Sequence, residues 1–204
     1  MPPVPLPPNA DFWFDPVCPY TWLASRWLRE VERVRDVTVR WRVMSLSVLN
    51  EHLDVDPEDP GGEWGDYMRA PGRVCAAVDE RYGNDALGTY LDALGVRLHE
   101  RGEWDGIEPA LADAGLPAEL ASVAWTQEYD AAVRASHEQG LALVGPDAGT
   151  PVLSVRGVGA VFGPVVSPAP KGEAAGRLWD GVVLMAGAPD FYELKRPYGE
   201  PAFG

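Results

Sequence analysis

The alternation of apolar and polar residues predicts a strand, a helix and a second strand within the first 45 residues. Residues 11–15 (DFWFD) form a short aromatic run that Pro16 ends, which is typical of a strand. The next apolar residues recur at helical spacing, namely Leu23, Trp27, Val31 and Val34. From 37 to 44, apolar residues take alternate positions, as in a half-buried strand. This βαβ unit predicts two parallel strands joined by a right-handed crossover.

The middle of the chain has a different period. An acidic loop with two prolines and a Gly-Gly pair is predicted over residues 51–66. Beyond it, helical patterns are punctuated by Gly and Pro, and strand-like alternation is absent. These patterns cover residues 73–82, 87–98, 107–114, 117–125 and 129–144. We therefore predict an all-helical insertion over about residues 46–145.

Strand patterns return after this insertion. The apolar runs 151–155 and 158–162 flank Arg156-Gly157, which is the signal of a hairpin. A final amphipathic helix is predicted over residues 171–186. The order βαβ, helical insertion, ββα predicts an α/β sandwich whose sheet is assembled from both sides of the insertion.

Composition and charge narrow the classes of function. The chain has 204 residues, of which 46 % are hydrophobic, so it can bury a proper core. Its net charge of −14 argues against nucleic acid or an anionic membrane as partner. No apolar run reaches the length of a membrane span of about 18 residues. The first ten residues lack the basic start and apolar stretch of a signal peptide, so a cytoplasmic location is expected.

The Cys and His residues exclude two further classes. The two cysteines, Cys18 and Cys75, lie far apart in sequence, which rules out a disulfide framework and a CxxC-type zinc site. The three histidines show no metal-binding spacing, so no metal site is expected; they are His52, His99 and His137.

Cys18 is the strongest candidate for chemistry. Pro19 suits the first position of a helix, which makes Cys18 the predicted N-cap. The free N–H groups and the positive dipole end of a helix N-terminus favour the thiolate, which is the nucleophilic form of cysteine. The alternative is an inert buried cysteine. Thr21 is either an ordinary residue of the first turn or the donor of a hydrogen bond to the Cys18 sulfur, which is expected if Cys18 is reactive. Tyr20 either shades the thiol or simply packs.

Three further positions carry alternative interpretations. Thr150-Pro151 opens a strand, and trans is the default for such a bond, whereas a cis bond would turn the Thr150 backbone toward a substrate near Cys18. Cys75 lies on the apolar face of a predicted helix and is expected in the core. The alternative is a disulfide between Cys75 and Cys18, which the sequence does not exclude. His99 ends an apolar helical run, either as a solvated helix end or as a group lining a pocket.

Taken together, these segments resemble the DsbA-like family, and in particular its actinobacterial branch of mycothiol-dependent nitroreductases, also called mycoredoxin-like. The likeness runs over nearly the whole chain. The stretches that carry it are residues 11–22, 25–27, 34–36, 43–46, 49–51, 112–120, 149–151, 162–164 and 193–196.

The resemblance implies a thioredoxin-like fold made of residues 1–45 and 146–204, with 46–145 as a helical lid over the cysteine. It implies that Pro151 is cis and faces Cys18, with Thr150 beside it, and it places Asn50 and His99 near the substrate. It also implies an enzyme without a tightly bound cofactor, usually a homodimer. Such an enzyme uses a low-molecular-weight thiol, mycothiol or a similar one, to reduce disulfides and small electrophilic or nitro compounds.

The sequence departs from the family at its central motif. The family has Cys-Pro-Trp-Cys, whereas this chain has Cys18-Pro19-Tyr20-Thr21 and lacks the second thiol. A monothiol cycle is therefore expected, in which Cys18 forms a mixed disulfide that an external thiol releases. Pro19, Tyr20 and Thr21 would stabilise the thiolate, and whether Cys75 takes part stays open.

The same departure leaves two alternatives. The motif also resembles kappa-class glutathione transferases and hydroxychromene-carboxylate isomerases, in which a single Ser or Cys activates a bound thiol. That likeness implies a thiol-dependent transferase or isomerase acting on an aromatic metabolite. The second alternative is a ligand-binding relative of these enzymes that has lost catalytic activity.

Overall fold

The sheet at the centre of the molecule has four strands in the order β2-β1-β3-β4. The computed structural model describes residues 9–146, 148–195, 197 and 199–203. Strand β1 (Ala10–Phe14) pairs in parallel with β2 (Val39–Val43) and antiparallel with β3 (Val152–Val155), which in turn pairs with β4 (Gly159–Phe162). Helix α1 (Pro19–Val34) connects β1 to β2, so the predicted βαβ unit is confirmed.

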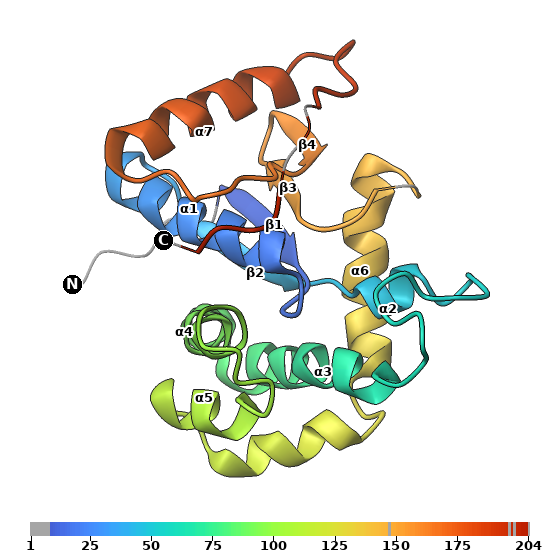
Figure 1. Ribbon diagram of the computed structural model, residues 1–204. Coiled ribbons are helices and arrows are strands. Elements are labelled where there is room, and N and C mark those ends of the chain that lie inside the picture. The colour runs from blue at the N-terminus through green and yellow to red at the C-terminus, as the bar shows by residue number, and fades with distance from the viewer. Residues whose placement is uncertain (1–8, 147, 196, 198, 204) are drawn as a thin grey trace.

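The remaining helices fall into two groups (Figure 1). Helix α7 (Gly172–Ala186) packs against α1 on one face of the sheet. The helices between β2 and β3 lie on the opposite side and form the predicted insertion. They are α2 (Leu46–Leu49), α3 (Gly65–Tyr82), α4 (Asn84–Gly95), a π-helical turn Val96–Glu100, α5 (Ile107–Asp113), a 3-10 helix Ala118–Trp125 and α6 (Asp130–Val144).

The insertion differs from its prediction in three places. Helix α3 begins at Gly65, before the expected start at residue 73, and carries Pro71 in its interior. Pro and Gly predict a break there, but the surrounding residues are buried, and this packing outweighs the lost backbone hydrogen bond. The short helix α2 was not predicted. The segment predicted as one helix over 87–98 divides into α4 and the π-helical turn.

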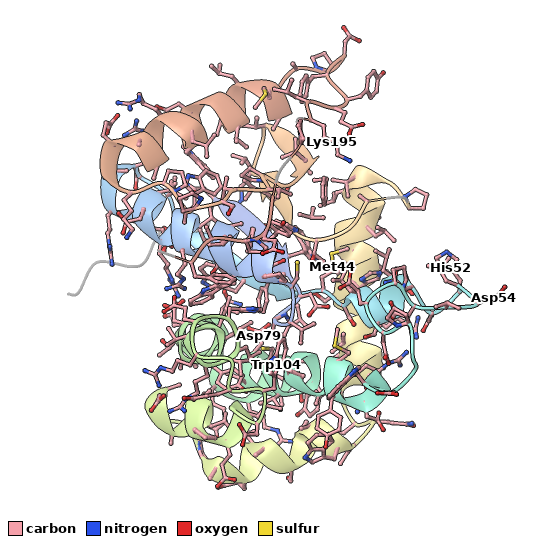
Figure 2. All side chains as sticks on the ribbon, in the orientation of Figure 1. Met44, His52, Asp54, Asp79, Trp104 and Lys195 are labelled. Carbon is pink, nitrogen blue, oxygen red and sulfur yellow. The ribbon has the colours of Figure 1, made fainter. Side chains whose placement is uncertain are left out.

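A single hydrophobic core joins the sheet to the insertion. Phe12 and Trp41 of the sheet pack edge to face at 5.7 Å between ring centroids. The same cluster of buried residues includes Val74 of α3 and Leu94 of α4. A smaller cluster around Met44, which is labelled in Figure 2, joins the end of β2 to α6. The insertion is thus packed directly on the fold that carries Cys18.

Gly95 of α4 allows the closest approach between the insertion and the start of α1. A Cβ at this position would lie 2.1 Å from Cε3 of the buried Trp22 ring. We expect Gly95→Ala to lower the free energy of unfolding by about 1–3 kcal/mol, because the indole must shift within a filled core. Urea denaturation measures this change.

Gly181 of α7 provides the matched control, because a Cβ there meets nothing within 4 Å. Gly181→Ala is expected to raise the free energy of unfolding by up to about 1 kcal/mol through the helix propensity of alanine. If both substitutions stabilised the protein alike, the close packing of Gly95 on Trp22 would be wrong.

Candidate active site

Cys18 occupies the N-cap of α1, as the sequence predicts, with Pro19 in the first turn. Its backbone is extended (φ −79°, ψ 117°), and its side chain makes no capping hydrogen bond. The first turn of this 16-residue helix carries no acidic side chain, so nothing there opposes the positive end of the helix dipole. Cys18 as a whole is buried, with 8 % of the residue exposed, whereas Cys75 is 0 % exposed.

The hydroxyl of Thr21 lies in the first turn of α1 but does not form a hydrogen bond with the Cys18 sulfur. It donates to Thr150 Oγ1 at 3.2 Å, and both residues are buried. The expected hydrogen bond from Thr21 to the thiol is therefore wrong, because the hydroxyl has a partner on the other side of the site. This contact joins the first turn of α1 to the start of β3.

The Thr150–Pro151 peptide bond is cis. The resemblance implies this isomer, and the default expectation of a trans bond is wrong. Thr150 is held beside Thr21, and Pro151 immediately precedes β3, the neighbour of β1 in the sheet. Two segments far apart in sequence thus meet at the N-terminus of α1.

Asp15 is a residue of the site that the sequence analysis did not single out. It is 2 % exposed at the end of β1, and its carboxylate accepts hydrogen bonds from the N–H groups of Val17 at 2.9 Å and Leu46 at 2.6 Å. Burial raises its pKa to about 7, although the two N–H donors act in the opposite direction. The backbone N–H of Cys18 donates to the Asp15 carbonyl at 3.1 Å. The signal in the sequence is a lone acid that follows an apolar strand and precedes the cysteine by one turn.

His99 lies against the segment that precedes Cys18 and is not a solvated helix end. Its Nε2–H donates to the carbonyl of Pro16 at 2.9 Å, just ahead of Cys18. Burial lowers its pKa, so the imidazole is neutral near pH 7. The ring stacks on Trp22 of α1, with 6.2 Å between centroids, and meets Trp104 edge to face. The insertion therefore contacts the segment between β1 and α1, which carries Pro16 and Cys18, through this imidazole.

The other predicted site residues have separate partners. The Tyr20 hydroxyl donates to the carbonyl of Gly199 at 2.8 Å, close to the C-terminus. Asn50 ends α2, and its amide donates to the Asp56 carboxylate at 2.8 Å, within the acidic loop. Cys75 of α3 is fully buried, and burial raises the pKa of its thiol, which agrees with the core position predicted for it. Both cysteines are free, so the disulfide left open above is not formed.

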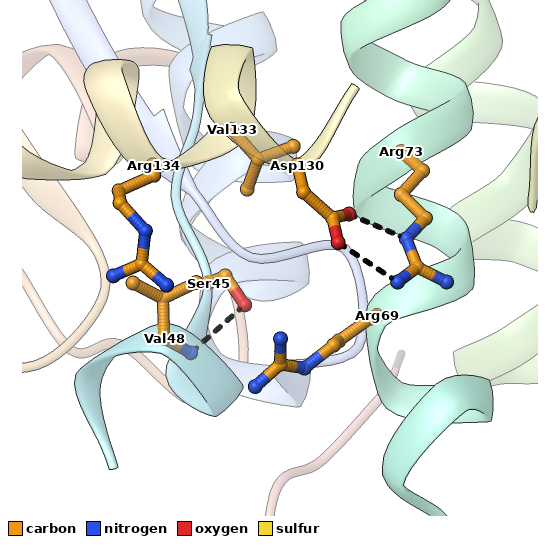
Figure 3. Close-up of a pocket in the computed structure, with 7 residues that line it drawn as sticks. All are labelled: Ser45, Val48, Arg69, Arg73, Asp130, Val133 and Arg134. Carbon is orange, nitrogen blue, oxygen red and sulfur yellow. Dashed lines mark hydrogen bonds and ion pairs between the residues drawn. The ribbon is translucent and has the colours of Figure 1, made fainter. Parts of the chain in front are cut away.

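A small cavity of about 40 Å³ lies within the insertion, among α2, α3 and α6 (Figure 3). Its lining consists of Ser45, Val48, Arg69, Arg73, Asp130, Val133 and Arg134. Arg73 forms hydrogen bonds with both carboxylate oxygens of Asp130, at 2.6 and 3.1 Å, and Arg134 pairs with Glu51. The first ion pair connects α3 to α6, and the second connects α6 to the segment that follows α2. The residues of the cavity wall therefore hold the helices of the insertion together.

In the part of the chain that the structure describes, no helix combines the length and the apolar character needed to cross a lipid bilayer.

Solved structures similar to this chain establish the fold. One is a probable DsbA oxidoreductase, SCO1869, from Streptomyces coelicolor, with a TM-score of 0.55, 18 % identity, and coverage of 92 % of this chain and 93 % of that chain. Another is a putative protein disulfide isomerase from Nitrosomonas europaea, with a TM-score of 0.55, 14 % identity, and coverage of 86 % and 98 %. The molecule thus has the DsbA-like thioredoxin fold, with a helical insertion between β2 and β3.

Sequence comparisons establish the family. Residues 17–196 match the Rv2466c-like family, described as mycothiol-dependent nitroreductase Rv2466c. The chain is also 35 % identical over 197 residues to the uncharacterized protein Rv2286c of Mycobacterium tuberculosis, covering 93 % of this chain and 82 % of that protein. This protein is therefore a member of the Rv2466c-like family of DsbA-like thioredoxin-fold proteins.

Proposed function

We propose that this protein is a monothiol oxidoreductase in which the Cys18 thiolate attacks a small disulfide or electrophilic substrate. A mycothiol-like thiol serves as its co-substrate. The observation that carries the proposal is the placement of Cys18 at the N-cap of a helix whose first turn has no acidic residue and whose Thr21 is hydrogen-bonded to Thr150. The family is named for a mycothiol-dependent nitroreductase, which supports both the thiol and the class of reaction.

The reaction with a disulfide proceeds in two exchanges. The Cys18 thiolate attacks one substrate sulfur, the substrate S–S bond breaks, and the departing thiolate takes a proton from water. The mixed disulfide on Cys18 is then attacked by the external thiolate, which releases Cys18 and forms a disulfide between thiol and substrate. A second external thiol completes the reduction and leaves the oxidised thiol dimer, so two thiols supply the two electrons.

The residues around Cys18 have distinct proposed roles. The positive end of the helix dipole stabilises the thiolate, and Pro19 begins the first turn without needing a partner for an N–H of its own. Thr150 and Pro151 dock the partner, and His99 and Asn50 border the substrate. Residues 46–145 act as the lid on a domain formed by 1–45 and 146–204, and the working unit is a homodimer.

A second candidate function is a thiol-dependent transferase or isomerase acting on an aromatic metabolite. The aromatic rings around His99 favour it, because Trp104 and Phe203 both contact this imidazole and are exposed enough to offer faces on which a planar substrate can stack. This reaction needs a thiol but consumes no reducing equivalents. It therefore tolerates Cys18→Ser, which the oxidoreductase does not.

Mass spectrometry of the intact protein tests the oxidoreductase. After incubation with mycothiol and a small disulfide, we expect a mixed disulfide that peptide mapping assigns to Cys18, because Cys18 lies at a helix N-terminus whereas Cys75 is fully buried within a helix. Cys75→Ala should give the same adduct. A product that carries mycothiol, formed without any adduct on the protein, would favour the transferase instead.

A further inference from the structure

The C-terminal segment 199–203 folds back to the candidate active site. In Figure 1 the red end of the chain returns from beyond α7 and runs beside α1. The Gly199 carbonyl accepts the hydrogen bond of Tyr20 Oη at 2.8 Å, and the Ala202 N–H donates to Ser167 Oγ at 2.9 Å. The segment is therefore held at two points, one of them on the first turn of α1.

Phe203 provides the third attachment. Its ring stacks on His99, with 6.1 Å between centroids and an angle of 26° between the planes. The imidazole also stacks on Trp22, at 6.2 Å and 22°, so it has stacked rings from both α1 and the C-terminal segment, besides the edge-to-face contact with Trp104. Phe203 thus helps to connect the insertion to the fold that carries Cys18.

These attachments lie on both sides of the cysteine. Tyr20 follows Cys18 in the first turn of α1, whereas His99 binds the carbonyl of Pro16, just ahead of it. A segment that contacts both Tyr20 and His99 has its attachments just before and just after Cys18 in the chain, and Cys18 itself is only 8 % exposed. Phe203 itself is 41 % exposed.

We propose that residues 199–203 form a strap across the approach to Cys18, and that Phe203 determines the size of the reagents that reach the thiol. With Phe203 on His99, small thiols and electrophiles are admitted, whereas the broad surface around a protein disulfide is excluded. The proposal rests on the proposed function in one respect, namely that Cys18 is the reacting group. It adds a specificity-determining residue that lies outside the Cys18 motif.

The test compares two maleimides of different size on the full chain. Cys18 is labelled with N-ethylmaleimide and with maleimide attached to a long polyethylene glycol chain, and the site of labelling is assigned by peptide mapping. We expect Phe203→Ala to raise the rate with the long reagent by up to about tenfold, the factor that one aromatic pair contributes to an equilibrium. The rate with N-ethylmaleimide is expected to change much less.

Two further variants make the result decisive. Ser167→Ala removes the acceptor of the Ala202 N–H and should shift the two rates in the same direction as Phe203→Ala. Tyr192→Ala, at a side chain that is 90 % exposed, should leave both rates unchanged. Equal acceleration with both reagents, or no acceleration in either strap variant, would overturn the proposal.

The labelling result is independent of turnover. If the strap variants accelerate only the long reagent while wild-type protein forms no mixed disulfide with mycothiol, the oxidoreductase fails and the strap stands. If the mixed disulfide forms but the labelling rates do not change, the strap fails and the oxidoreductase stands.

Discussion

Replacing Cys18 with serine is expected to lower thiol-dependent disulfide reduction by at least about 1000-fold, measured as kcat/KM. A serine hydroxyl stays protonated at neutral pH and does not form a disulfide, so the mixed-disulfide step is lost. The change is nearly isosteric at a residue whose side chain makes no capping hydrogen bond, so the fold should be retained. Circular dichroism and urea denaturation verify this.

Cys75→Ala is the matched control for the serine variant. Cys75 is fully buried in α3, away from any helix start, so its loss should leave kcat/KM unchanged. It should lower the free energy of unfolding by about 1–2 kcal/mol through the space left in the core. A Cys18→Ser protein with nearly full activity would contradict the oxidoreductase and favour the transferase or isomerase.

Replacing Arg73 with methionine is expected to lower the free energy of unfolding at pH 7 by about 1–3 kcal/mol, since the Asp130 side chain left behind is 34 % exposed and water solvates part of its charge. The Arg73 side chain is 4 % exposed and donates to both Asp130 oxygens and to the Ala124 carbonyl. Methionine fills much of the same volume but donates no hydrogen bond, so these acceptors lose their partner. Urea denaturation of both proteins measures the difference.

The pH dependence of that difference follows from Asp130. The hydrogen bond from Arg73 holds the pKa of the Asp130 carboxyl below its ordinary value of 3.8. A lowered native pKa contributes stability that is fully present above pH 3.8 and is lost as the pH falls through the native pKa. The difference in the free energy of unfolding between wild type and Arg73→Met should therefore be constant near neutral pH and become smaller below about pH 4.

Arg134→Met is the control in the same cavity wall. Arg134 pairs with Glu51 through two hydrogen bonds, but its side chain is 43 % exposed, so water replaces the lost contact. We expect a loss of at most about 1 kcal/mol. Equal losses for Arg73→Met and Arg134→Met would show that burial does not set the strength of these ion pairs.

Most elements of the fold could be predicted because their patterns are local. The alternation around Trp41 and the helical spacing after Pro19 placed β2 and α1 to within a few residues. The start of α3 could not be predicted in this way, because Pro71 and Gly72 signal a break and only tertiary burial overrides them. Helix α2 could not be predicted either, because its four residues are too few to show a helical period.

The site was predictable only where a local motif defines it. The N-cap position of Cys18 follows from the adjacent Pro19, and the structure confirms it. The hydrogen bond between Thr21 and Thr150 joins residues separated by 129 positions. No local pattern therefore indicates that the Thr21 hydroxyl bonds to Thr150 and not to the Cys18 sulfur. The burial of Asp15 and the return of Phe203 to His99 likewise depend on the complete fold.

The burial of Cys75 has a consequence for oxidative damage. When a peroxide converts a thiol to sulfenic acid, a neighbouring thiol ordinarily captures it as a disulfide before irreversible oxidation to sulfinic acid. This chain has only two cysteines, and the other one is enclosed in the core, while Thr21 stands in the first turn beside Cys18. Rescue of an oxidised Cys18 then depends entirely on thiols from outside the protein, and its lifetime under peroxide stress follows their concentration.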